Sequence, residues 1–336
     1  MTDLVRLSQI VYNQPHHLTP AAGELIAAVL ARRAGIQLQT TVDQPEIISD
    51  GFVGEPALDK NRRPTGYRIT KSGVAIVPIT GELVNRGAWL GATSGLVSYE
   101  GLRQTIKTAG KDRKVRAVVL DVDSPGGMAT GMIETAALVR ELAKSKPVLA
   151  AANGMMASAA YGICSGATRI YTTLTSHLGF IGTLVMHLDR SGEMDQRGWK
   201  ITPIHEGAHK VDGNQFKPLP EPVRQDLQRS CQIMQKMFVA TVVAGRPMTE
   251  AEVRGTEARI FLGREAVRRK LADSIASFDE VAAHAAWLGR MPATRSARAR
   301  AVPKKVPAVA TEEATVRTLS MRGARLADIA NHKRGA

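Results

Sequence analysis

Apolar runs and amphipathic stretches alternate along the middle of the chain, at the spacing of strands and helices. The predicted strands cover residues 67–70, 74–80, 115–123, 147–152, 181–189, 199–205 and the start of 259–273. The predicted helices cover 19–35, 99–110, a stripe formed by Met132, Ala136, Val139 and Leu142, a small-residue stretch that begins near Ser158, 191–198 and 219–243. Because strands and helices alternate, we expect an α/β domain whose strands pair in parallel through right-handed crossovers.

An uncharged run of 22 residues lies between Lys146 and Arg169 and has the length of a membrane span. It consists of Ala, Gly and Ser rather than Leu, Ile and Phe, and it contains Asn153-Gly154. This composition instead predicts a buried strand, a tight turn at 153–154 and a small-residue helix. Ser158 then stands where the helix begins, among free backbone N–H groups.

Composition divides the 336 residues into three parts. Residues 1–66 form an N-terminal helical and linker segment, with a loop or linker at 40–66, and residues 67–289 form the main domain. Residues 290–336 carry eleven Lys and Arg against three Asp and Glu. The net charge of this part is therefore +8 (11 − 3), which is more than half of the formal charge of +14. We expect a disordered basic tail that is solvated or that contacts nucleic acid or an acidic partner, and no nucleic-acid contact elsewhere. A partner could induce a helix at 315–330.

The two cysteines and eight histidines have neither a disulfide framework nor the spacing of a zinc site, so we expect no metal and no cofactor. The first residues lack a basic stretch followed by an apolar one. We therefore expect no signal peptide or membrane anchor, and a cytoplasmic protein.

Two features of the predicted sheet could carry chemistry. Ser124-Pro-Gly-Gly127 follows the strand at 115–123, at the end where open α/β sheets place their sites. Its successive glycines allow backbone N–H groups to face a developing negative oxygen, although such sequences are usually only turns. Ser158 follows the next strand and is either packing filler or a nucleophile, and its surroundings do not match the Gly-x-Ser-x-Gly elbow.

A nucleophilic serine needs a base, and the sequence leaves several open. The candidate histidines are His177, His187, His205 and His209, none of which has an obvious Asp partner. Lys210 is the other candidate, and it lies in the polar loop 206–213. A lysine serves as a base only where desolvation lowers its pKa toward neutrality, and most loop lysines are simply solvated.

Four segments occur in an order and spacing that resembles the Ser–Lys peptidases of the signal peptide peptidase A (protease IV) type. The segments are Asp123–Gly127, Met155–Tyr161, Gly179–Thr183 and His209–Gly213, within a similarity that covers roughly 67–280. The wording His-Lys-Val-Asp-Gly and the expected lack of an anchor are most like the phage prohead (capsid maturation) protease branch. Two departures are Ala-Ala after the serine, where many relatives have Gly-Gly, and Arg-Lys-Leu-Ala-Asp273, where Gly-Leu-Val-Asp is usual.

The resemblance implies the Clp protease/crotonase-like ββα superhelix and a catalytic dyad. Ser158 would be the nucleophile, and Lys210 the general base and later the acid. Gly127, with Gly126, and the N–H of Ala159 would form the oxyanion hole. The family assembles into rings, and in members with one Ser–Lys set the two residues can come from adjacent protomers, so we expect a homo-oligomer.

The functional hypothesis is a serine endopeptidase that cleaves scaffold, portal or capsid proteins and its own C-terminal tail inside a phage procapsid. One alternative is a housekeeping cytoplasmic peptidase with the same chemistry. Another alternative is a crotonase-like acyl-CoA enzyme, which would use the same backbone donors without Ser158 or Lys210. The tail at 290–336 could also act as a scaffold or docking element.

Overall fold

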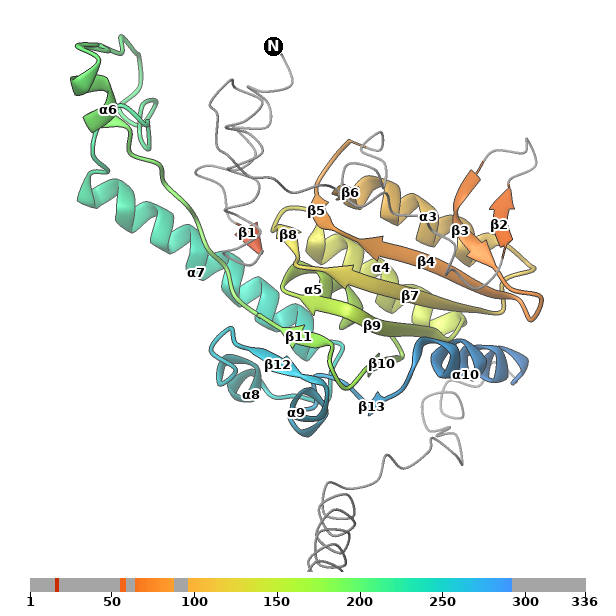
Figure 1. Ribbon diagram of the computed structural model, residues 1–336. Helices are drawn as coiled ribbons and strands as arrows, with labels where there is room; N and C mark the ends of the chain where they lie inside the picture. Colours follow the sequence, from red (N-terminus) through yellow and green to blue (C-terminus); the bar gives the residue numbers. More distant parts are fainter. Residues whose placement is uncertain (1–15, 18–54, 59–63, 88–95, 292–336) are drawn as a thin grey trace, which may run out of the picture. The chain divides into compact units, whose positions relative to one another are not determined.

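The computed structural model describes residues 16–17, 55–58, 64–87 and 96–291 (Figure 1). The predicted helix at 19–35 lies outside the described residues. The predicted tail does so as well from residue 292 onward, including the stretch at 315–330.

A mixed sheet with a parallel centre forms the framework of the described chain. Its strand order is β12-β11-β9-β7-β4-β3-β2, and β10 and β13 pair beside β9. These strands are β2 (Glu55–Leu58), β3 (Pro64–Ile69), β4 (Val74–Thr80), β7 (Ala117–Ser124), β9 (Val148–Ala157), β10 (Arg169–Thr172), β11 (His177–Gly179), β12 (Ile260–Leu262) and β13 (Ser274–Ile275). The neighbours β4, β7, β9 and β11 pair in parallel, as the alternation of strands and helices predicted.

A second, smaller sheet lies at the carboxyl ends of β4 and β7. Its order is β1-β8-β5-β6, and its strands are β1 (His16–His17), β5 (Glu82–Val84), β6 (Leu96–Ser98) and β8 (Gly127–Met128). Because β5 follows β4 and β8 follows β7, the chain leaves the main sheet at this edge and forms a second layer of strands there.

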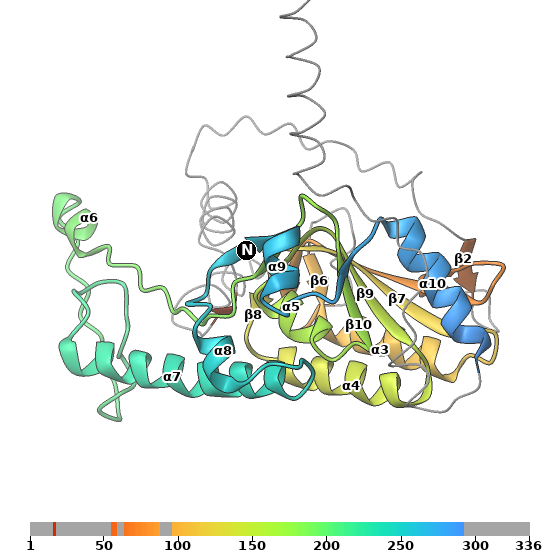
Figure 2. The ribbon, with the colours of Figure 1, turned by 90° about the horizontal axis from the view of Figure 1, so that it is seen from below.

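Helices cover both faces of the main sheet (Figure 2). One face contacts α3 (Tyr99–Lys111), α4 (Met132–Ser145) and α5 (Ala159–Cys164), and the other contacts α10 (Phe278–Arg290). The helix α7 (Glu221–Val243) packs against α4, α5 and α8 (Glu250–Arg254). The remaining helices are α6 (Ser191–Gln196) and α9 (Gly263–Arg268). Capping boxes begin α8 at Thr249 and α10 at Ser277, as their Ser/Thr-x-x-Glu sequences predict.

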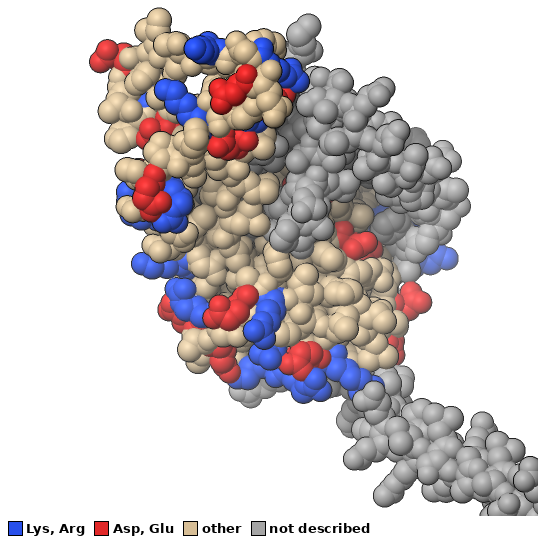
Figure 3. Space-filling model, turned by 60° about the vertical axis from the view of Figure 1, so that its left-hand side comes forward, with Lys and Arg blue, Asp and Glu red and all other residues tan. Residues whose placement is uncertain are grey.

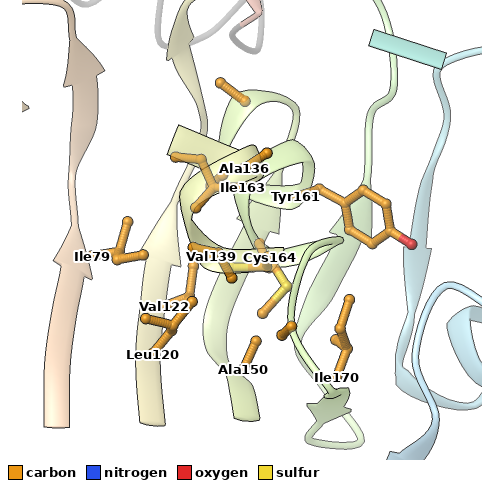
Figure 4. Packing of buried hydrophobic residues seen from close by; sticks show 14 of the residues in the cluster. Ile79, Leu120, Val122, Ala136, Val139, Ala150, Tyr161, Ile163, Cys164 and Ile170 are labelled. Carbon is orange, nitrogen blue, oxygen red and sulfur yellow. The ribbon is translucent and has the colours of Figure 1, made fainter. Parts of the chain in front are cut away.

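The hydrophobic core lies between the sheet and α4 and α5. In Figure 4, side chains from β4, β7 and β9 meet those of the two helices. Gly162 in α5 explains why the uncharged run is made of small residues, because a Cβ there would come within 2.6 Å of the sulfur of Met132 and 3.0 Å of the ring of Phe238. The run is therefore a buried strand and helix. No helix among the described residues is long and apolar enough to cross a membrane.

Four local predictions were wrong. The predicted turn at 153–154 does not form, because β9 continues through it to Ala157 and the Met155 N–H donates to Asp123 Oδ1 at 2.9 Å. Part of the predicted linker 40–66 belongs to the sheet, since β2 pairs with β3. The strand predicted at 181–189 does not form, because β11 ends before it at Gly179 and within 181–189 only Leu184 forms an isolated bridge. The described residues 199–205 form neither a strand nor a helix.

The last two errors share a cause. Alternating apolar residues predict a strand, but a strand is stable only beside a partner that accepts its hydrogen bonds. The segment from 183 to 220, here called the arm, contains α6 and extends away from the main sheet (Figure 1). Its two sides are joined by the Arg190 N–H, which donates to Gln215 O at 2.8 Å.

Candidate active site

Ser158 occupies a strained turn between β9 and α5. Its φ of 53° and ψ of −121° fall in a region that residues other than glycine rarely adopt, at a cost of about 1–3 kcal/mol. Two backbone hydrogen bonds hold this conformation, since the Ser158 N–H donates to Gly179 O at 2.7 Å and its carbonyl accepts from Gly162 N–H at 2.9 Å. A sharp strand-to-helix turn of this kind is the setting of nucleophilic serines in other folds, although the sequence around it differs.

The hydroxyl of Ser158 is buried without a hydrogen-bond partner among the described residues. The residue is 0% exposed, and its Oγ contacts no acceptor or donor in this part of the chain. A buried polar atom of this kind costs about 1–3 kcal/mol. A strained backbone and an unsatisfied hydroxyl at the same residue are difficult to explain as packing filler, because alanine would avoid the second cost.

The segment Ser124–Gly127, here called the glycine turn, lies beside Ser158, as the parallel topology predicted. Ser124 ends β7 opposite Met156 of β9, two residues before the serine, and α5 contacts β8. At Gly127 a Cβ would lie 1.9 Å from the carbonyl oxygen of Leu83 in β5, so the close approach of β5 and β8 requires glycine there. Both turns therefore lie at the carboxyl edge of the central strands.

Backbone donors are present at this edge, but they are not equivalent. Gly126 has a φ of 104°, and its N–H already donates to Ser124 Oγ at 3.2 Å. Ala159 is buried and is the first residue of α5, so no earlier helical turn accepts its N–H. Ala159 is consequently better placed than Gly126 to offer its N–H to a ligand.

Lys210 lies apart from this edge, on the arm. It is exposed in a turn in which its own N–H donates to Gly207 O at 3.2 Å, and the neighbouring His209 pairs with Asp212 at 2.8 Å. Because Ser158 Oγ has no partner among the described residues, this single chain joins the serine neither to Lys210 nor to any histidine that the sequence offered as a base.

The structure adds acidic residues near the edge that the sequence analysis missed. Burial raises the pKa of Glu82, the first residue of β5, to about 8. Burial, together with the nearby Asp123 carboxylate, raises the pKa of Asp121 to about 6, although a hydrogen bond from Asn153 opposes the shift. Glu82 begins β5 and Asp121 lies within β7, and acidic residues at such positions are common in sequences, so no local signal marked these two carboxyls.

A buried ion pair supports α5 from behind. The Arg246 side chain is 3% exposed, and it pairs with Asp273 at 2.9 Å and donates to Lys270 O at 2.8 Å. Tyr161 of α5 donates to Leu271 O at 3.1 Å in the same turn. The segment Arg269–Asp273 therefore holds the helix that begins beside Ser158. Its sequence departs from the one that is usual in the resembled family.

Comparison with known proteins shows that the sequence is similar to those of peptidases. Residues 140–290 match the family model for Peptidase family S49. The chain is 36% identical over 275 residues to the head-tail preconnector protein GP5 of Enterobacteria phage P21, covering 80% of this chain and 55% of that protein. It is 32% identical over 284 residues to capsid assembly protease C of Escherichia phage lambda, covering 82% of this chain and 64% of that protein.

A cellular relative aligns with a smaller part of this chain. A putative signal peptide peptidase SppA of Enterococcus faecium is 31% identical over 184 residues, which are 53% of this chain and 52% of that protein. The chain thus spans between half and two thirds of the length of these relatives. The matches confirm the resemblance that the four ordered segments indicated.

Proposed function

We propose that this chain, whose residues 140–290 match the model for Peptidase family S49, is a serine endopeptidase of phage capsid assembly. The observation that carries the proposal is the strained, buried turn that places the unpartnered Ser158 hydroxyl beside the glycine turn. Relatives named for capsid assembly and head-tail connection support the phage setting over a housekeeping peptidase.

In the proposed reaction Ser158 Oγ attacks the carbonyl carbon of a peptide bond. Lys210, as the neutral amine, takes the hydroxyl proton while the oxygen–carbon bond forms. The negative oxygen is stabilised by the N–H groups of Gly127 and Ala159, with Gly126 in a minor role because its N–H is already used. The C–N bond then breaks, the leaving amine receives the proton, and water hydrolyses the resulting ester with the lysine again as base.

The dyad of this proposal forms between two copies of the chain. Ser158 is buried without a partner among the described residues, and Lys210 is exposed on the arm, so each copy supplies half of the site. The arm exposes several large apolar side chains, because Trp199, Ile201 and Phe216 are between 41% and 55% exposed and Ile204 is 98% exposed. Such an exposed apolar group is typical of a surface that another protein covers.

The surface next to the arm fits the same arrangement. Figure 3 shows charged side chains at the top, along the left-hand side and at the bottom of this face, with a largely uncharged strip between them. Residues 181–188 contain no Asp, Glu, Lys or Arg, and Ile233 and Met237 of α7 are 57% and 49% exposed. A neighbouring copy that covers this surface would bring its own arm toward the serine, and repetition of the contact would close a ring.

Mixing two inactive variants tests this dyad directly. Ser158→Ala and Lys210→Ala each abolish peptide cleavage in the proposal, because each removes one half of every site. When the two are mixed and allowed to exchange subunits, the lysine of the first variant meets the serine of the second, and partial activity returns. A mixture that stays inactive despite proven subunit exchange would place both residues in one copy, and full activity of either single variant would exclude the dyad.

The substrates are inferred from the phage relatives and not from the geometry of the site. We propose that they are scaffold, portal or capsid proteins and the basic tail of the chain itself. Incubating the wild type with the structural proteins encoded beside it, and measuring fragment masses, tests this assignment. Cleavage only of short peptides would favour the housekeeping alternative, and calorimetric binding of coenzyme A would favour the acyl-CoA alternative.

A further inference from the structure

A short strand from the N-terminal part of the chain lies against the glycine turn. The backbone of β1 pairs antiparallel with β8, with His17 opposite Gly127 and His16 opposite Met128 (Figure 1). In the smaller sheet β8 has β5 on one side and β1 on the other. The strand that would carry an oxyanion donor therefore has no free edge in this state of the chain.

The direction of the donors follows from the other edge of β8. The Leu83 N–H of β5 donates to Gly126 O at 2.8 Å, and Leu83 stands opposite Gly127 in the parallel ladder. In a parallel ladder the residue opposite such a donor and acceptor turns its own N–H and C=O to the other side. The N–H of Gly127 consequently faces β1, and the residue directly opposite it there is His17.

A substrate would need the edge that β1 occupies. Extended peptides commonly bind proteases and other domains by adding a strand to an exposed sheet edge, with main-chain hydrogen bonds fixing their direction. On β8 that strand would present its backbone to the N–H of Gly127, at the carboxyl edge of the sheet where Ser158 lies. One N–H cannot serve both β1 and the oxyanion of a substrate.

We propose that the segment containing His16 and His17 is a built-in pseudo-substrate, which occupies the substrate strand position on β8 and holds the peptidase inactive until it is displaced. This inference rests on the proposed function, because it assigns a regulation to the same site. The occupant belongs to the same chain, so it competes at a high effective concentration. The described part of its ladder is two residues long, and a protein substrate or an assembly contact can therefore displace it.

Two proline substitutions in the full-length chain test the pairing. His17→Pro removes the backbone N–H that faces β8, whereas His16→Pro removes one that faces away from it, because neighbouring residues of a strand alternate. We expect His17→Pro to raise kcat/KM for a short peptide about 3- to 10-fold, which is the range of one lost hydrogen bond. His16→Pro should stay near the wild type.

The rival explanation is that β1 merely completes the smaller sheet. In that case His17→Pro would lower the thermal midpoint of unfolding without raising activity. A variant whose activity is lower than that of the wild type, or equal to it, overturns the inference. Trimming of the wild type near residue 17, absent in Ser158→Ala, would support it, because a segment in the substrate position is open to attack by the serine.

Amide hydrogen exchange gives a readout that does not depend on catalysis. In full-length Ser158→Ala, adding His17→Pro should speed exchange at Gly127, while the Met128 amide, which faces β5, serves as the internal control. Active wild type with unchanged exchange and unchanged rate in His17→Pro would overturn the inference and leave the proposed function standing. Faster exchange in a chain that cleaves no peptide at all would overturn the proposed function and, with it, the role of β1 as a pseudo-substrate.

Discussion

The sheet core and the arm differ in how their side chains are satisfied. In the core the chain buries its apolar residues, pairs its strands in the sheet and holds Ser158 in a strained turn with two backbone hydrogen bonds. On the arm, large apolar side chains such as Ile204 remain exposed, and a segment patterned like a strand has no sheet partner among the described residues. This contrast is what the proposed dyad requires, because in that proposal the core supplies the serine and the arm of a second copy supplies the lysine.

The largest expected effect separates the two halves of the dyad. Ser158→Ala on the core and Lys210→Arg on the arm should each lower kcat about a thousandfold or more, because the first has no nucleophile and an arginine cannot lose its proton. Peptide cleavage measures both variants. Ser145→Ala and Lys217→Arg, which alter exposed residues of the core and the arm, should stay active, and substantial activity in Lys210→Arg would remove Lys210 from the reaction.

The next effect concerns ion pairs. Asp273→Asn leaves the buried Arg246 guanidinium without its counter-ion, so we expect a loss of about 3–5 kcal/mol in the free energy of unfolding, measured by urea denaturation. On the arm, Glu193→Gln breaks pairs with Arg190 and Arg197 that are partly exposed, and it should leave the free energy of unfolding almost unchanged because solvent screens such pairs. Equal losses would mean that the arm is as firmly packed as the core.

Glu82 makes the stability of the core depend on pH. Burial raises its pKa from 4.5 to about 8, so in this window the folded chain keeps a proton that the unfolded chain releases. Stability therefore falls as pH rises from about 4.5 to 8, by an amount on the order of a few kcal/mol. Glu82→Gln stays neutral and should lose this dependence in urea titrations at several pH values, and an unchanged slope would show that the carboxyl is solvated.

Alanine substitutions at two glycines compare how tightly the core and the arm are packed. Gly162→Ala pushes a methyl group toward Met132 and Phe238 and should destabilise the core by about 1–3 kcal/mol. A methyl group added to Gly192 of α6 would meet nothing within 4 Å, so Gly192→Ala should be neutral or stabilise by up to about 1 kcal/mol. Thermal unfolding measures both changes, and a costly Gly192→Ala would indicate a tight contact around α6.

The smallest expected effect falls on self-association. Ile204→Ser should leave the unfolding of an isolated chain unchanged, because the side chain is 98% exposed, but it should weaken assembly roughly tenfold if a second copy covers the arm. Sedimentation at several concentrations measures this shift. Leu58→Ser, at a 51% exposed residue of β2, is the matched control, and an equal response of the two variants would argue against the arm as the interface.

Much of the framework could be predicted from sequence, because burial imposes periodicity. The apolar run at 115–123 and the small-residue run after Lys146 predicted two central strands and the helix α5. The turn predicted at 153–154 was wrong because Asp123, distant in sequence, accepts the Met155 N–H and keeps the strand extended. The strand predicted at 199–205 was wrong because no sheet neighbour is present in the described chain.

The sequence by itself determined which residue types stand at the ends of the central strands, and therefore that a serine and a pair of glycines would meet at one edge. Only the tertiary structure decided that the Ser158 hydroxyl is buried without a partner among the described residues, that the Gly126 N–H is already used, and that β1 lies along β8. The physical reason is that periodicity encodes burial within a single element. Hydrogen-bond partners are chosen among segments that the sequence holds far apart.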